Sequence, residues 1–107
     1  MAVFPSKPDE VIYVAGPMTG LPDFNFPAFH SMSARLRELG FIVLSPAEHN
    51  HGFGKPWQFY MREALSLLLK CDSVIMLEGW NNSKGAKLEW HIAQALQMKI
   101  RHESEMR

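Results

Sequence analysis

Hydrophobic positions along the chain alternate between two periodicities. Short continuous apolar runs, typical of strands buried on both faces, occupy residues 11–15, 41–44 and 73–77. After each of them, apolar residues recur every three to four positions, as on one face of a helix, over residues 26–39, 57–70 and 84–97. This repeated order of strand and helix, with short connections, predicts a parallel sheet with right-handed crossovers.

Residues with turn and capping preferences mark the ends of these elements. Asn25 and Ser83 are suited to cap the first and third helices, and Gly40 is suited to end the first. Residues 99–101 can form a short edge strand. The expected buried positions of the helices are Phe29, Met32, Leu36 and Leu39 in the first, Tyr60 or Met61, Ala64, Leu65, Leu68 and Leu69 in the second, and Ala86, Ile92, Ala93 and Leu96 in the third.

The predicted fold class is a small flavodoxin-like (Rossmann-like) α/β three-layer sandwich. Its parallel sheet has three to four strands in the order 2-1-3, with the fourth at the edge. Residues 1–10 are expected to be a loose lead-in, residues 11–101 the domain, and residues 102–107 a tail. In such sheets, ligands bind beyond the carboxyl ends of the strands. We therefore expect function in the loops 16–25, 46–56 and 78–83.

Composition narrows the classes of protein and partner. The 107 residues fit one domain, and 11 basic against 11 acidic residues give no charge excess for a nucleic-acid polymer or a membrane. The single Cys71 cannot form an internal disulfide, and neither a signal peptide nor a long apolar run is visible. The sequence has no cysteine or carboxylate at metal-ligand spacing from His49 and His51. We expect a cytoplasmic protein without metal or cofactor.

Glu89 is the most informative single residue. At about 100° per residue, it falls in the middle of the apolar arc of the third helix, beside the small residues Gly85, Ala86 and Ala93. A carboxylate that faces a sheet is costly unless it is partnered or functional. Glu89 is therefore either a reactive carboxylate at the crevice or a structural one bonded to a backbone amide or a tyrosine.

Other candidates lie around the same crevice. Gly16, Pro17 and Met18, in the first loop, allow the backbone to approach a ligand closely, although the run matches no established phosphate-loop pattern. Ser83 is a helix cap, a phosphate seat, or both. Tyr13 is either a core aromatic residue or part of the site, and Trp80 either lines the pocket or packs in the core.

Three segments carry a family resemblance. They are Ile12 to Met18, Cys71 to Val74, and Gly79 to Glu89, with the pattern S-x-G-A-x-x-E as the most specific part. Together they resemble the nucleoside 2-deoxyribosyltransferase superfamily, and within it a branch of small phage and bacterial proteins. The resemblance covers about residues 10 to 100.

The resemblance implies roles for individual residues. The glutamate matching Glu89 attacks C1′ of a nucleoside, and a glycosyl-enzyme intermediate passes to another base or to water. The tyrosine matching Tyr13 helps to hold that nucleophile. Serine at the position of Ser83 resembles the related nucleotide N-hydrolases, whereas the transferases carry an acidic residue there. Ser83, with Gly16, Pro17, Met18, Trp80 and Gly85, is thus expected to contact a nucleotide or nucleoside.

One departure keeps two functions open. The superfamily's aspartate in the second helix is replaced by Ala64, with Glu63 beside it. Either Glu63 takes its place, another loop supplies the group, or the N-glycosidic activity is reduced or lost. The first hypothesis is an enzyme that cleaves or exchanges the N-glycosidic bond through Glu89. The alternative is a non-catalytic nucleotide-binding or nucleotide-sequestering module. A sheet this small leaves a shallow crevice, so we also expect a homodimer, with Phe53, Trp57 and Trp90 as interface candidates.

Overall fold

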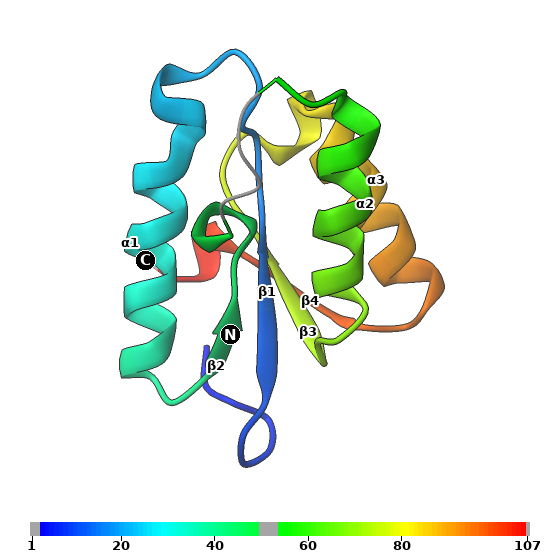
Figure 1. Cartoon of the computed structure of the whole chain (residues 1–107). Helices are drawn as coiled ribbons and strands as arrows, with labels where there is room; N and C mark the ends of the chain where they lie inside the picture. Colours follow the sequence, from blue (N-terminus) through cyan, green and yellow to red (C-terminus); the bar gives the residue numbers. More distant parts are fainter. Residues whose placement is uncertain (1–2, 50–53, 107) are drawn as a thin grey trace.

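The computed structural model describes residues 3–49 and 54–106. Its elements are β1 (Val11–Ala15), α1 (Phe26–Glu38), β2 (Ile42–Leu44), α2 (Trp57–Leu68), β3 (Ser73–Met76), α3 (Lys84–Ala95) and β4 (Lys99–His102). The four strands form one parallel sheet in the order β2-β1-β3-β4. Helix α1 covers one face, and α2 with α3 cover the other (Figure 1). The predicted three-layer fold and strand order are confirmed.

Two apolar clusters, one on each face, fix these layers. Side chains alternate along a strand, so Ile12 and Val14 of β1 pack with α1, whereas Tyr13 and Ala15 pack with α2 and α3. From β1 the chain passes to β2, on one side of β1, and then returns to form β3 on the other side of β1. The winding therefore reverses between β1 and β3, where a crevice at the carboxyl ends is expected.

The inner faces of two helices differ from the pattern-based expectation. In α2 the buried positions are Met61, Ala64, Leu67 and Leu68, whereas Leu69 is 61% exposed. Leu96, expected on the inner face of the third helix, follows the end of α3 and is 55% exposed. Both errors fall at helix ends, where the chain leaves the helical path and a wheel no longer gives the direction of the side chain.

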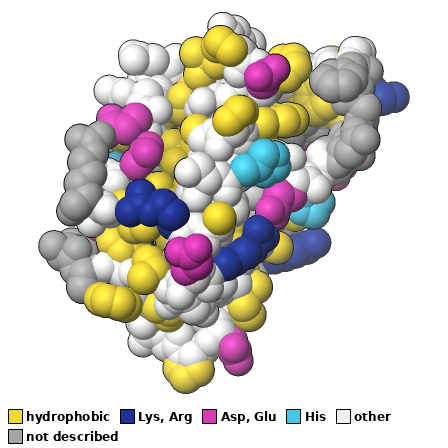
Figure 2. All heavy atoms as spheres, turned by 90° about the vertical axis from the view of Figure 1, so that its left-hand side faces the viewer, with side chains coloured by type: hydrophobic (Ala, Val, Ile, Leu, Met, Phe, Trp, Pro, Cys, Tyr) yellow, Lys and Arg dark blue, Asp and Glu magenta, His cyan; other side chains and the backbone are white. Residues whose placement is uncertain are grey.

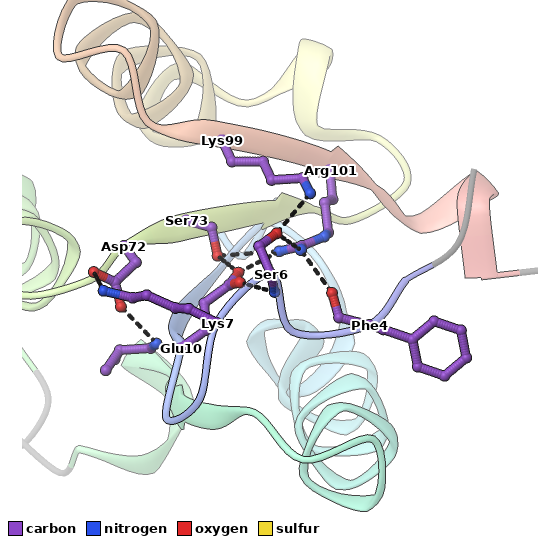
Figure 3. A network of polar contacts seen from close by, with 9 residues as sticks. Phe4, Ser6, Lys7, Glu10, Asp72, Ser73, Lys99 and Arg101 are labelled. Atoms are coloured by element: carbon purple, nitrogen blue, oxygen red, sulfur yellow. Dashed lines mark hydrogen bonds and ion pairs between the residues drawn. The ribbon is translucent and has the colours of Figure 1, made fainter.

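The amino ends of the strands are joined by a buried ionic network (Figure 3). Arg101, fully buried in β4, donates to Glu10 at 2.7 Å and to Ser73 at 3.2 Å, and also to the backbone oxygen of Phe4 at 3.0 Å. Glu10 accepts further bonds from the Ser73 hydroxyl and the Ser6 amide. The network attaches residues 4–10 of the N-terminal lead-in to the sheet, at the end opposite the expected crevice.

The last described residues also pack on the domain. Residues Glu103–Met106 form a short 3₁₀ turn after β4, and Met106 packs against the α1-side cluster. Among the described residues, no helix has the length and hydropathy needed to span a membrane.

Candidate active site

Glu89 and Tyr13 form the centre of the candidate site. Glu89, in the middle of α3, is 5% exposed, and Tyr13, in the middle of β1, is fully buried. The Tyr13 hydroxyl donates a hydrogen bond to Glu89 Oε2. Residues 76 positions apart in the sequence are thus joined directly between helix and sheet. The sequence-based expectation of a partnered or functional carboxylate on this face agrees with this contact, which fits both a nucleophile and a structural residue.

Burial dominates the electrostatics of the pair. Removal from water raises the pKa of the Glu89 carboxyl to about 8, while the hydrogen bond from Tyr13 opposes this shift. The pKa of the Tyr13 hydroxyl is raised well above its usual value, first by burial and then by the neighbouring carboxylate. In the ligand-free protein at neutral pH, Glu89 is therefore protonated in most molecules, and Tyr13 keeps its proton.

This shift predicts a specific dependence of stability on pH. The pKa of Glu89 is higher in the folded chain, about 8, than its usual 4.5. The stabilisation that Glu89 contributes to the free energy of unfolding is therefore fully present below about pH 4.5, and it is lost as pH rises through 8. Urea unfolding at a series of pH values should show stability falling over this range, and Glu89→Gln should flatten the curve. A slope that is identical in the variant would contradict the assignment.

Ser83 is the N-cap of α3, as predicted. Its Oγ accepts a hydrogen bond from the Ala86 amide at 3.2 Å. The first amides of a helix have no acceptor within the helix, so an anion can bind there. Ser83 precedes Glu89 by six residues on the same helix. A phosphate group at Ser83 and a sugar at Glu89 would thus be positioned by one rigid element.

The loop after β1 packs tightly against the loop after β3. A Cβ on Gly16 would lie 2.8 Å from Leu77 Cβ, so only glycine fits at this position. Pro17 Cγ lies 3.4 Å from the position of a Cβ on Gly79, whose φ of 84° also favours glycine. Met18, by contrast, packs on the α1-side cluster, in a different layer from Tyr13 and Glu89. Gly16 and Pro17 therefore hold the loop after β1 against the loop after β3, and Met18 anchors the loop on the α1 side.

The contact between α2 and α3 explains the glycine at position 85. A Cβ on Gly85 would lie 3.0 Å from Met61 Sδ and 3.9 Å from Trp57 Nε1. The ammonium of Lys84 lies 4.2 Å from the Trp57 ring centroid, a cation–π geometry. Gly85 thus allows the helices to approach each other closely beside the start of α3.

Trp80 lies in an aromatic stack next to a shallow hollow. Its ring stacks on Trp90 with centroids 5.6 Å apart, and the His102 ring is 6.0 Å away. The hollow, about 240 Å³, is lined by Met76, Leu77, Glu78, Gly79, Trp80, Asn81, His102, Glu103 and Ser104. Glu89 is not among these lining residues. The Glu89 carboxyl, on a residue that is 5% exposed, lies beneath other side chains and not in this hollow.

Ala64 occupies an inward position on α2. It is 9% exposed and belongs to the same apolar cluster as Tyr13 and Ala86. Glu63 beside it is half-buried. The inward position to which the family resemblance assigns an aspartate therefore carries a methyl group.

Other candidate chemistry lies away from this site. Burial raises the pKa of the Cys71 thiol to about 12, which agrees with an inert thiol. Within residues 3–49 and 54–106, no group of three histidine, cysteine or acidic side chains is arranged to hold a metal ion. His51 and Phe53 lie outside the described residues.

The comparisons with known proteins agree with this architecture. The sequence profile of the family described as "Domain of unknown function (DUF4406)" matches residues 10–102. The chain therefore belongs to the DUF4406 family. No curated protein matches the sequence.

The fold is similar to that of a solved enzyme structure, the 2-desoxiribosyltransferase from Leishmania mexicana. The TM-score is 0.67 at 21% sequence identity, over 87% of this chain and 63% of that protein. This chain thus spans less than two thirds of the length of the Leishmania protein. At this identity, the match establishes a shared fold.

Proposed function

We propose that this protein cleaves or exchanges the N-glycosidic bond of a deoxynucleoside 5′-monophosphate or nucleoside, with Glu89 as nucleophile. The observation that carries the proposal is the buried Glu89 carboxyl, bonded to the hydroxyl of Tyr13 near the switch point of the sheet. The fold shared with the Leishmania 2-desoxiribosyltransferase supports it. So does the pattern Ser83-Lys84-Gly85-Ala86-Lys87-Leu88-Glu89, which places a capped helix start and a carboxylate on one element.

The chemistry follows from a carboxylate close to C1′. An oxygen of ionised Glu89 forms a bond to C1′ while the C1′–N bond breaks. The electron pair of the broken bond leaves with the base, which takes up a proton. The positive charge that develops on the sugar is stabilised by the carboxylate. Water or a second base then attacks C1′ and releases Glu89. Tyr13 orients the carboxyl group throughout.

The ionised form must become available when the ligand binds. With a pKa of about 8, Glu89 is mostly protonated in the free protein. Opening of the site to a polar ligand reduces the desolvation that raises this pKa, and a developing positive charge lowers it further. The bound state therefore favours the nucleophilic carboxylate.

Ala64 favours a second candidate function, a non-catalytic nucleotide-binding module. The side chain at the inward position of α2 carries no charge or hydrogen-bonding group next to Tyr13. A pocket without that group can retain a nucleotide and lack efficient bond cleavage. The two candidates thus share a ligand and differ in turnover.

One experiment separates them. Purified protein is incubated with the four deoxynucleoside 5′-monophosphates and the matching nucleosides, and free base is measured by chromatography while calorimetry measures binding. Release of base supports the enzyme, and tight binding without release supports the module. If the protein neither releases base nor binds any of these ligands, both candidates are refuted.

A prediction for Ser83 tests the phosphate seat. Ser83→Asp places a negative charge beside the first amides of α3 and should repel a 5′-phosphate. Binding of deoxynucleoside 5′-monophosphates should weaken roughly tenfold or more, with little change for nucleosides. Asn82→Asp, one residue earlier and exposed, adds the same charge outside the cap and serves as the control. An equal effect on both ligand types would contradict a phosphate seat.

We also propose a homodimer whose partner covers the shallow site. The hollow beside Trp80 is small and open, whereas ligand sites usually enclose most of the ligand. Trp57 and Trp90 have ring contacts within the chain but are only half-buried, so part of each remains for an interface. Light scattering at micromolar concentration should give twice the mass of the chain. A monomer mass with full ligand binding would refute this arrangement.

A further inference from the structure

The loop between β1 and α1 contains a left-handed turn that demands an explanation. Asp23, Phe24 and Asn25 have consecutive φ values of 52°, 52° and 61°. Residues with side chains rarely adopt this conformation, and a bulky residue such as phenylalanine does so least readily. Strain of this kind persists where surrounding contacts maintain it, and it concentrates near functional sites.

Apolar burial does not account for the turn. Leu21 and Phe24 are 40% and 47% exposed. Figure 2 shows apolar side chains at the upper end of the α1 face, the end at which α1 begins in Figure 1, and also lower on the same face. The tip of the turn therefore places its apolar groups at the surface. Polar contacts must therefore contribute more than apolar burial to the stability of the turn.

The side chain of Asn25 supplies such a contact. The sequence predicts that Asn25 caps α1 through its side chain, but although Asn25 occupies the cap position, its side chain makes no cap bond. Its amide nitrogen Nδ2 instead donates to the backbone oxygen of Pro17, at 3.0 Å. Glycine would adopt the left-handed conformation at lower cost. What asparagine adds is this bond to Pro17.

The bond connects the turn to the candidate site. Pro17 is the residue whose ring packs against Gly79. Gly79 begins the segment that leads through Trp80–Asn82 to Ser83, the cap of α3. A continuous path of contacts thus runs from Asn25 through Pro17 and Gly79 to the helix that carries Glu89.

We propose that Asn25 is a positioning residue that holds the loop after β1 against the loop after β3, and thereby sets the shape of the nucleotide site at the strand ends. The inference rests on the proposed function, because it assigns the bound nucleotide to the carboxyl ends of β1 and β3, beside these loops. Asn25 does not touch the reacting atoms. Its effect reaches the ligand through Pro17 and Gly79.

Two variants and one control test the proposal. Asn25→Asp keeps the shape of the side chain and removes the donor. Asn25→Gly removes the donor and relieves the left-handed strain, so it should keep or raise the melting temperature. Asp23→Gly relieves strain two residues earlier in the same turn and leaves the Asn25–Pro17 bond intact.

We expect both Asn25 variants to weaken binding of the four deoxynucleoside 5′-monophosphates by up to about tenfold, the worth of one hydrogen bond. Asp23→Gly should bind as the wild type does. In a turnover assay, KM should rise with kcat within about twofold. Loss of binding in Asn25→Gly without loss of melting temperature separates positioning from general stability. Wild-type binding in both Asn25 variants would overturn the proposal.

Spectra of the ligand-free protein test Asn25 independently of the proposed function. If the wild type binds no nucleotide, the proposed function fails, and the NMR amide signals of Gly79 and Ser83 then decide the role of Asn25. Shifts of both signals in the two Asn25 variants, absent from Asp23→Gly, support the positioning path. Unchanged signals at Gly79 and Ser83 overturn it.

Discussion

Glu89→Gln is expected to lower the rate of base release by at least about a hundredfold, because the variant lacks the carboxylate that attacks C1′ and stabilises its charge. Glutamine has nearly the same shape, and its amide oxygen can still accept the hydrogen bond from Tyr13. The fold should therefore remain intact, as circular dichroism and the melting temperature will show. Base release measured by chromatography at saturating substrate gives the effect on kcat.

Glu63→Gln is the matched control. Glu63 is a half-buried carboxylate on α2, and its replacement should leave base release within about twofold. If Glu89→Gln releases base at the wild-type rate, Glu89 is a structural residue bonded to a tyrosine and the catalytic proposal fails. If Glu63→Gln is the inactive variant, the nucleophile has been assigned to the wrong helix.

The fold could be predicted from the sequence because each element has one dominant periodicity. The run Val11 to Ala15 is apolar throughout, as expected of a strand covered on both faces, and it coincides with β1. Glycine and proline mark the loops that follow the strands. The ends of α2 and α3 were less predictable, because at a helix end the local path of the chain, and not the wheel, decides the direction of Leu69 or Leu96.

The central pair of the site was predictable in part. A helical wheel of residues 84–97 places Glu89 on the buried face, because the residues around it on the wheel are apolar or small. No local pattern, however, could show that Tyr13 would reach it from β1, since the pairing depends on how α3 lies on the sheet. The family resemblance supplied that partner. The inward direction of Ala64 was foreseen from the apolar positions of its helix.

Contacts between distant polar residues were not predictable. Asn25 has the residue type of a helix cap, so its bond to Pro17 was hidden by a commoner role. Arg101 reads as a surface residue at the edge of the sheet. One indication was its place in the short strand. Arg101 pairs with Ile75 of β3, and Ile75 belongs to the α1-side cluster, so the side chain of Arg101 is directed to the same covered face. A buried arginine requires a buried partner, and Glu10 lies 91 residues away.

The buried Arg101–Glu10 pair carries the largest expected effect on stability. Arg101→Met should lower the free energy of unfolding by about 3–5 kcal/mol, because it leaves the Glu10 carboxylate buried without its cation. It also removes the stacking of the guanidinium 4.9 Å from the Phe41 ring centroid. Lys99→Met is the control: Lys99 is exposed on the same strand, and its bond to Ser6 should contribute less than about 1 kcal/mol.

The same pair predicts sensitivity to acid. Burial alone would raise the pKa of Glu10, but the hydrogen bonds from Arg101, Ser73 and Ser6 outweigh it and lower the pKa from 4.5 to about 2. The stability that Glu10 contributes is therefore present above about pH 4.5 and lost as pH falls through 2. The free energy of unfolding of the wild type, measured with urea, should fall steeply over this interval, by about 3 kcal/mol.

A double variant tests the ion pair directly. Without the Glu10 charge this pH dependence disappears, so Arg101→Met, Glu10→Gln should lose the acid-sensitive step and regain part of the stability lost in Arg101→Met. A double variant as unstable as the single one would show that the guanidinium acts through Phe41 and Phe4, and not through the ion pair.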